Sequence, residues 1–301
     1  MKKYLYNLVF AALILLSTTE VLASNEVYYI NRENIEMTEQ EYNNLLELGF
    51  THDQIERMDN NTFQDNKDIE ATLISTNKRY YKFTDVMRNG IQYRFSEEIT
   101  KEEAEELQKQ ARNPMNNRGA SGNYYDGLVG SYALEVADYI TNISNTYMRF
   151  KADATWLTPP STSERFNDIL GIGFEGGKVQ FGSTIVFRED WKRTNGNFDY
   201  TDICTPVYES TGGSVIFGLP TVAVQYITSY IYFNVRKQSN AGTITSLTIG
   251  SEYAHSTSNI SRPNIEGHYS VNYINGILLD STLAPYFSES GVATAYFIGT
   301  W

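Results

Sequence analysis

The feature that most constrains the fold is a strict alternation of side chains between Tyr147 and Trp156. The even positions are apolar or small, and the odd positions are mostly polar or charged: Met148, Phe150, Ala152, Ala154 and Trp156 against Tyr147, Arg149, Lys151, Asp153 and Thr155. A period of two places the two sets on opposite faces of a β-strand. The pattern therefore predicts a ten-residue strand with one buried face and one polar face.

The same alternation continues through the second half of the chain. Apolar side chains share one parity in two further runs: Val179, Phe181, Ile185 and Phe187, and Ile231, Phe233 and Val235. More strands are expected at residues 131–142, 214–218, 243–255, 268–274 and 292–301. About nine strands with turn residues between them and no helical period indicate a mainly β domain, an antiparallel β-sandwich or a related fold.

Two of these strands carry more specific expectations. Glycines alternate with apolar residues in one of them: Leu170, Gly171, Ile172, Gly173 and Phe174. Such a strand has a flat face that another main chain can approach closely. The last strand has apolar residues on one side: Ala293, Ala295, Phe297 and Trp301. We therefore expect Trp301 to pack into the core.

Composition divides the 301 residues into modules. In residues 24–113, 30 of 90 side chains are charged, but only 27 of 188 are charged in residues 114–301. The first part suits short solvated helices and the second suits strands and turns. We expect a signal peptide at 1–23, a small α+β module at 24–112, a breaker-rich linker at 113–123 and a β-rich domain at 124–301. The module at 24–112 is either permanent or a pro-region released at Arg112 or Arg118.

The α+β module has recognisable helix starts and one turn. Thr38 with Glu41, Thr51 with Gln54, and Thr100 with Glu103 have the spacing of capping boxes, in which each side chain satisfies a free backbone N–H. Gly49 is placed to end the first helix in the left-handed conformation. Residues 69–94 are expected to form two strands around a tight turn at Asn89-Gly90.

The N-terminus has the three parts of a secretory signal peptide. Lys2 and Lys3 supply positive charge, residues 8–16 form an apolar run, and Val21-Leu22-Ala23 carries small residues at the positions that precede cleavage. The run is about half the ~20 residues that a membrane-spanning helix needs. We therefore expect cleavage after Ala23 and an extracellular mature protein.

Charge and cysteine content argue against several classes of function. The formal charge is −12 and the pI is about 4.8, so the chain is a poor partner for nucleic acid. Cys204 is the single cysteine, and the three histidines have no ligand spacing, which disfavours zinc sites and an internal disulfide. No EF-hand pattern occurs. We expect no cofactor and no metal.

Two groups of residues could in principle support enzymatic chemistry, and the surrounding sequence favours neither. Cys204 with His255 or His268 is the one conceivable thiol–imidazole pair, but Cys204 is more typical of a small buried residue and His255 of a sheet surface. Glu189-Asp190-Trp191 is the most suggestive acidic cluster for glycosidase chemistry, because an indole can stack on a sugar ring. Its flanking sequence is that of an ordinary exposed loop. A secreted hydrolase is therefore the least favoured of the three interpretations, behind a binding protein and a membrane-active protein.

A binding or adhesion module is the preferred interpretation. Tyr226, Tyr230 and Tyr232 are expected along one face of a strand, where rigid rings with hydroxyl tips could contact a glycan or protein of a cell surface or cell wall. Trp191 is a further candidate contact. The competing structural interpretation is that tyrosine is simply favoured on half-exposed sheet faces.

A membrane-active β protein is the alternative. Residues 147–156 have the length of a membrane-crossing strand, and the Ser/Thr-rich run at 243–261 is similar to an insertion hairpin of a secreted pore former. A strand of a water-soluble sandwich would give the same alternation.

Several segments taken together resemble a family of proteins secreted by Gram-positive bacteria. They are "EMTEQEYNNLLELGFTHDQIERM", "RYYKFT", "FNDILGIGF", "SYIYFNVRKQSNAGTITSLTIGSEYAHST" and the terminal "GTW". The resemblance covers most of the mature chain and implies secretion and the same order of modules. The family has no established activity, so the resemblance implies no catalytic residues.

Overall fold

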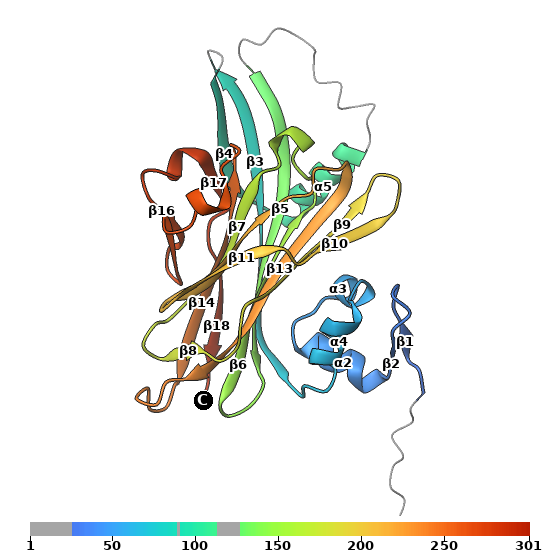
Figure 1. Cartoon of the computed structure of the whole chain (residues 1–301), viewed down its shortest axis with the longest axis vertical. Helices are drawn as coiled ribbons and strands as arrows, with labels where there is room; N and C mark the ends of the chain where they lie inside the picture. Colours follow the sequence, from blue (N-terminus) through green and yellow to red (C-terminus); the bar gives the residue numbers. More distant parts are fainter. Residues whose placement is uncertain (1–25, 89–90, 113–126) are drawn as a thin grey trace, which may run out of the picture. The chain divides into compact units, whose positions relative to one another are not determined.

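The computed structural model describes residues 26–88, 91–112 and 127–301. The chain divides into two compact units, which are described separately. The first contains the described residues up to Leu46 together with Phe50–Ile69, and the second contains Glu47–Gly49 and Glu70–Trp301. Figure 1 labels most of their helices and strands. The expected signal peptide at 1–23 and linker at 113–123 lie outside the described residues.

The first unit consists of short helices and one small pair of strands. Strands β1 (Tyr29–Ile30) and β2 (Glu36–Met37) are antiparallel, and the helices are α2 (Glu39–Glu47), α3 (His52–Glu56) and α4 (Asn60–Asn66). The predicted capping boxes are present. The Glu41 N–H donates to Thr38 Oγ1, and the side chains of Thr51 and Gln54 each accept a hydrogen bond from the other residue's main-chain N–H. Gly49 has a φ of 85°, as its position after the first helix predicts.

The second unit is an antiparallel β-sandwich, which confirms the expected fold class. Its large sheet has eight strands in the order β10-β9-β13-β6-β5-β3-β4, with β8 also paired to β13. Their bounds are β3 (Thr72–Arg88), β4 (Ile91–Ile99), β5 (Gly127–Asn142), β6 (Tyr147–Trp156), β8 (Val179–Phe181), β9 (Val186–Arg193), β10 (Phe198–Thr201) and β13 (Val224–Lys237). Helix α5 (Lys101–Arg112) follows β4 and begins at the predicted Thr100–Glu103 box.

The second sheet has six strands in the order β11-β12-β7-β14-β17, with β18 also paired to β14. They are β7 (Asn167–Phe174), β11 (Cys204–Glu209), β12 (Gly212–Gly218), β14 (Ser246–Ser256), β17 (Phe287–Glu289) and β18 (Ala293–Ile298). Strands β15 (Tyr269–Asn272) and β16 (Gly276–Leu279) form a separate hairpin. The 3₁₀ turns are η1 (Thr162–Glu164), η2 (Arg262–Asn264) and η3 (Ala284–Tyr286).

The apolar faces of the two sheets form one core. All five even-numbered residues of β6 are buried, and Phe150 packs against Phe174 of the second sheet and Phe233 of β13. Trp301 is 7% exposed and belongs to the same core, as its predicted position requires. The apolar residues of the alternating pattern therefore lie on the side of each strand that faces the other sheet.

The glycine face of β7 is covered by the β15–β16 hairpin. A Cβ added at Gly173 would overlap the main chain of Asn272 and Tyr273, and one added at Gly171 would lie 3.2 Å from Val271. The expectation that another main chain approaches this strand closely is confirmed. The absence of side chains at these positions is what lets the hairpin lie flat on the sheet.

Two expectations about strands need correction. The sequence places the strands around Asn89-Gly90 in one module with the N-terminal helices, but β3 pairs with β5 along most of its length and so belongs to the large sheet. Their local turn signal carried no information about this distant partner. The run from Val179 to Phe187 is also divided between β8 and β9, which both pair with β13.

Candidate functional site

The structure places the expected tyrosine stripe in two different environments. Tyr230 is 1% exposed and Tyr232 is 6% exposed, and their rings stack with centroids 6.3 Å apart. Cations lie over both rings: Lys151 Nζ is 5.3 Å from the Tyr230 centroid, and Arg149 Cζ is 4.4 Å from that of Tyr232. These two tyrosines are therefore buried, contrary to the expected exposed stripe, because rings and cations of neighbouring strands pack together on this face.

Tyr226 occupies a more accessible position at the start of β13. It lies opposite Lys192 of β9, which in turn lies opposite Phe198 of β10, so the three side chains form a row across three neighbouring strands. The rings of Phe198 and Tyr226 meet edge to face at 6.2 Å, and Lys192 Nζ is 5.2 Å from the Phe198 centroid. All three side chains are half-buried. This row is an aromatic platform that carries one positive charge.

The platform borders a groove of about 670 Å³, which we call the side groove. Its wall combines parts of α5, the segment that follows β6, β9 and the start of β13: Gln108, Ala111, Leu157, Thr158, Pro159, Lys192, Thr194, Val224, Gln225 and Tyr226. Gln108 Nε2 donates to the Leu157 carbonyl at 3.4 Å, and the Thr194 N–H donates to that of Ala223 at 3.2 Å. Amides, hydroxyls and one ammonium group thus surround a ring, which suits a polar ligand with hydroxyl groups.

The Glu189-Asp190-Trp191 cluster is a buried strand segment, which corrects the exposed-loop interpretation. Glu189 is 0% exposed and shares the core-facing side of β9 with Trp191, and Asp190 is 1% exposed and accepts from Arg188 Nε at 2.9 Å on the other side. Burial raises the pKa of Glu189 well above its ordinary value, and nearby Asp168 adds to the effect. Trp191 is half-buried against the core, and its Nε1 has no hydrogen-bond partner among the described residues. The two carboxylates are closed to a sugar substrate.

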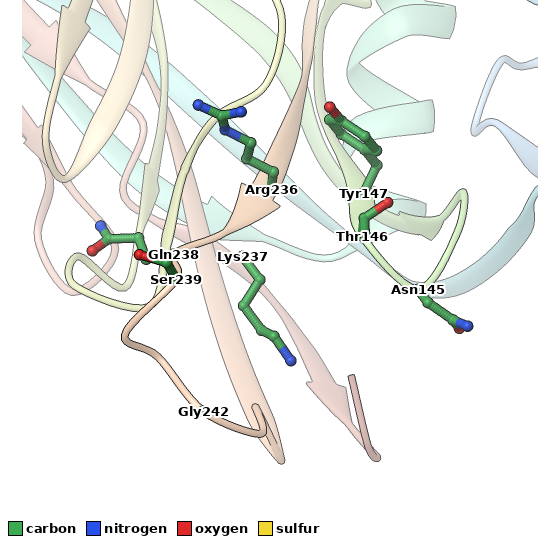
Figure 2. A pocket seen from close by; sticks show the side chains of 8 residues that line it. All are labelled: Asn145, Thr146, Tyr147, Arg236, Lys237, Gln238, Ser239 and Gly242. Carbon is green, nitrogen blue, oxygen red and sulfur yellow. The ribbon is translucent and has the colours of Figure 1, made fainter.

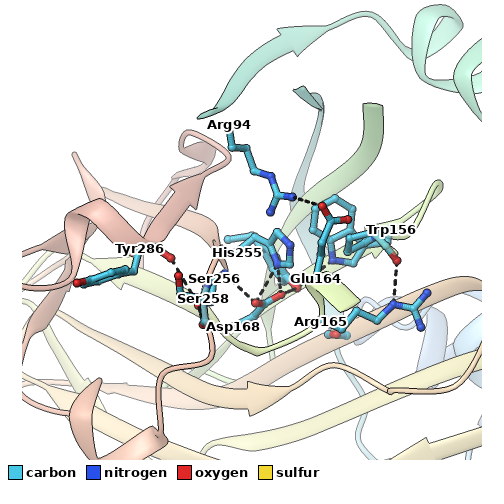
Figure 3. A network of polar contacts seen from close by, with 12 residues as sticks. Arg94, Trp156, Glu164, Arg165, Asp168, His255, Ser256, Ser258 and Tyr286 are labelled. Atoms are coloured by element: carbon cyan, nitrogen blue, oxygen red, sulfur yellow. Dashed lines mark hydrogen bonds and ion pairs between the residues drawn. The ribbon is translucent and has the colours of Figure 1, made fainter. Parts of the chain in front are cut away.

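A buried polar network joins the two sheets near Asp168, and Figure 3 shows part of it. Asp168 accepts from the Tyr253 hydroxyl, from His255 Nδ1 at 2.9 Å and from the Ser256 N–H at 3.0 Å. Trp156 of the large sheet donates through Nε1 to the Tyr253 hydroxyl at 2.9 Å. This chain of hydrogen bonds crosses the core and satisfies polar groups that burial would otherwise penalise.

His255 is fully buried, which corrects its expected place on a sheet surface. Its ring lies edge to face with Trp156 at 5.2 Å, and its Nε2 has no hydrogen-bond partner within the described part of the chain. An Asp–His pair of this kind can orient a general base, but this imidazole is 0% exposed. Cys204 is half-buried, and burial raises its pKa to about 11, so the thiol is protonated at neutral pH.

No group of three His, Cys, Asp or Glu side chains in residues 26–88, 91–112 and 127–301 could hold a metal ion. Within these ranges no helix is long and apolar enough to cross a membrane.

The segments assigned to the membrane-active alternative are internal strands. Strand β6 lies between β5 and β13, and β14, which covers most of residues 243–261, pairs with β7 on one side and with β17 and β18 on the other. Nine of the eleven β14 residues are buried. Insertion of either segment into a bilayer would break paired strands on both of its sides.

No protein-family model and no curated protein sequence matches the chain. Among solved structures, the collagen-binding subdomain of the Enterococcus faecalis surface protein ACE is 7% identical, with a TM-score of 0.26, over 38% of this chain and 80% of its own. The collagen-binding domain of the Erysipelothrix rhusiopathiae surface protein RspB is 7% identical, with a TM-score of 0.26, over 58% and 74% of the two chains. The C-terminal domain of the Streptococcus agalactiae AgI/II polypeptide BspA is 7% identical, with a TM-score of 0.26, over 61% and 75%. These values assign the chain to no family.

Proposed function

We propose that the chain is a secreted binding protein that recognises a glycan of a cell surface or cell wall through the side groove. The observation that carries this proposal is the row of Phe198, Lys192 and Tyr226 beside the amides of Gln108 and Gln225. A half-exposed ring offers an apolar face to a sugar ring, while its hydroxyl tip stays available for a hydrogen bond. Amide and hydroxyl side chains can pair with sugar hydroxyls on either side.

The groove is built on rigid elements, which favours binding. Its floor comes from paired strands of the large sheet, and its rim is tied by hydrogen bonds from Gln108 and Thr194 to main-chain oxygens. A preformed site loses little conformational entropy when a ligand enters. The carboxylates of Glu189 and Asp190 and the imidazole of His255, by contrast, are buried among the sheets, so binding is the better-supported function.

The proposal is tested with the secreted mature protein and a panel of purified cell-wall glycan, mucin and neutral oligosaccharides. Binding is measured by glycan array and then by calorimetry. We expect Tyr226→Ala to weaken binding of the best ligand by about tenfold, the loss that ~1.4 kcal/mol of stacking energy would cause. Tyr296→Ala serves as the matched control, because Tyr296 is 58% exposed on β18 and lies outside the groove.

Two results would oppose the proposal. One is that no member of the panel binds, and the other is that Tyr226→Ala and Tyr296→Ala bind the ligand equally well. Unfolding temperatures of both variants show whether a loss of binding reflects a loss of folding. A protein from a host surface would be the remaining class of partner if glycans fail and a surface protein is bound.

The localisation and proteolytic processing of the chain form part of the same proposal. We propose cleavage after Ala23 and release outside the cell. Proteolysis between residues 113 and 123 would cut the covalent connection between β3–β4 and the strands with which they pair. Mass spectrometry of the protein recovered from culture medium identifies the N-terminus and shows whether the product begins near Ser24 or after the linker.

A further inference from the structure

A second pocket, which we call the end pocket, lies where β13 ends and β6 begins. It is an open pocket with a volume of about 410 Å³, and it is lined by the turn before β6 and the loop after β13. Figure 2 shows the side chains that line it. Arg236 lies directly opposite Tyr147 in the β13–β6 pair, so both side chains project from the same face of the large sheet. Lys237 projects from the other face at the same end.

The end pocket carries two cations in a chain whose formal charge is −12. Neither Arg236 nor Lys237 forms an ion pair with an Asp or Glu side chain of the described residues. Arg236 instead donates to the amide oxygen of Gln180 at 2.7 and 3.0 Å, and Lys237 donates to a main-chain oxygen of Trp301 at 3.1 Å. Other surface cations of the described residues, such as Arg79 and Lys178, sit beside a carboxylate, whereas Arg236 and Lys237 do not.

The walls of the end pocket are held in place by their own hydrogen bonds. Ser144 Oγ accepts from the main-chain N–H groups of Thr146 and Tyr147, each at 3.2 Å. Across the pocket, Gln238 Nε2 donates to the Val179 carbonyl at 3.1 Å, and the Ala241 N–H donates to the Gln238 carbonyl at 3.0 Å. Both loops are therefore fixed before any ligand arrives, which lowers the entropic cost of binding.

Tyr147 adds a ring to this charged site. It is 36% exposed, and it packs so closely on Gly182 that a Cβ there would lie 2.8 Å from the ring. The pocket thus offers a guanidinium group, an ammonium group, an aromatic edge, and the amide and hydroxyl side chains of Asn145 and Thr146. Guanidinium binds carboxylate and sulfate oxygens through paired N–H donors.

We infer that the end pocket is a binding site for an acidic polysaccharide, with a carboxylate or sulfate group of the sugar bound by the Arg236 guanidinium on the Tyr147 side of the sheet and with Lys237 adding positive charge from the other face. The ring of Tyr147 and the neighbouring hydroxyl and amide groups contact the sugar itself, which favours a charged sugar over an acidic peptide. The side groove and the end pocket lie at opposite ends of the β6–β13 pair, so this site is independent of the glycan site proposed above.

The experiment measures binding of four probes to the mature protein by calorimetry at low and at physiological ionic strength. The probes are a sulfated heparin tetrasaccharide, a tetragalacturonate, neutral maltotetraose and tetraglutamate. We expect the sulfated or the carboxylated sugar to bind and the neutral sugar not to bind. Affinity should fall several-fold between the two salt concentrations, since the contact is between charges near the surface.

Substitutions locate the site. We expect Arg236→Gln to weaken binding of the acidic sugar by at least tenfold, and Tyr147→Ala to weaken it less. Arg79→Gln is the matched control, because Arg79 is also an exposed arginine of the large sheet but pairs with Glu98. Tyr226→Ala should leave this binding unchanged, which separates this site from the side groove. Unfolding curves of each variant verify that the fold is intact.

Three outcomes would overturn the inference. The first is that no acidic sugar binds to the folded protein, and the second is that Arg236→Gln and Arg79→Gln bind the sugar equally well. The third is that tetraglutamate binds at least as tightly as both acidic sugars, which would assign the pocket to acidic peptides instead.

Discussion

Substitution of Gly173 by alanine tests how the β15–β16 hairpin is held on the second sheet. An added Cβ would lie well within 3.0 Å of the Asn272 carbonyl group and the Tyr273 nitrogen, closer than Cβ atoms come to other groups in proteins. These neighbours are main-chain atoms that cannot rotate aside like the end of a side chain. The hairpin main chain would have to retreat by about 1.4 Å to reach ordinary van der Waals separation.

The magnitude follows from the two ways in which the structure can respond. Overpacking that shifts neighbouring groups costs about 1–3 kcal/mol, and main-chain neighbours place this case at the upper end. Complete release of the hairpin would expose Val271 and Ile277, now 1% and 2% exposed, at about 1.5–3 kcal/mol each. Shifting the hairpin is therefore the cheaper response. We expect a loss of about 3 kcal/mol, which lowers the unfolding temperature by about 6–12 °C in a domain of this size.

Gly218→Ala is the matched control. Gly218 is also a strand glycine of the second sheet, but the nearest atom to an added Cβ is Asn167 Oδ1 at 3.5 Å, an ordinary contact. Alanine there reduces the conformational entropy of the unfolded chain, so stability should stay the same or rise by about 0.4–1 kcal/mol. Unfolding is followed by tryptophan fluorescence in a thermal and a urea series.

The reasoning is refuted if Gly173→Ala unfolds at the same temperature as Gly218→Ala, or at a higher one. Limited proteolysis adds a local readout. Faster cleavage within residues 269–279 of the Gly173→Ala protein would show that the strain is relieved at the hairpin, and an unchanged cleavage pattern with a large loss of stability would place the damage elsewhere.

Three further predictions concern the core. Asp168→Asn places an amide beside groups that donate to the native carboxylate, so it should lower the free energy of unfolding in urea by about 1–3 kcal/mol. Asp280→Asn at the surface is the control and should lower it by under ~1 kcal/mol. Burial raises the pKa of Asp138 to about 7 and that of Glu252 to about 8, so the folded state binds protons that the unfolded state releases. The urea midpoint should therefore be higher at pH 5 than at pH 8, and a midpoint that rises with pH would contradict the buried carboxyls as the cause. Removal of residues 292–301 deletes β18 and Trp301 from the core, so the product should be insoluble or rapidly proteolysed; a soluble truncated protein with a cooperative transition would count against this role.

Local patterns predicted the elements that depend on near neighbours. The alternation at 147–156 matches β6 residue for residue, the capping boxes at Thr38, Thr51 and Thr100 begin helices, and the glycines of β7 receive another main chain. The sequence does not predict the short strands with weak alternation, which are β1, β2, β10, β11, β16 and β17. Their positions depend on partners far along the chain, which a window of ten residues does not contain.

The candidate sites were less accessible to sequence reasoning. Tyr226 was recognised as a candidate contact, but Lys192 and Phe198 reach it only through strand pairing, and no pattern in the sequence indicates that pairing. Arg236 lies in one of the segments that resemble proteins secreted by Gram-positive bacteria, yet its position opposite Tyr147 depends on the register of β13 against β6. Aromatic residues spaced two apart in a sequence also indicate that their rings share one face of a strand. The spacing does not indicate which side chains pack over that face.

The sequence by itself determined that the second half of the chain forms pleated strands with one dry side, because a period of two depends on adjacent residues alone. It also determined where helices begin and where a strand is flat. The tertiary structure decided which strands pair, that Tyr230 and His255 are buried, and which side chains meet in the side groove and the end pocket. Those outcomes depend on contacts between residues far apart in the chain. Such contacts contribute to the free energy of folding only once the sheets have formed.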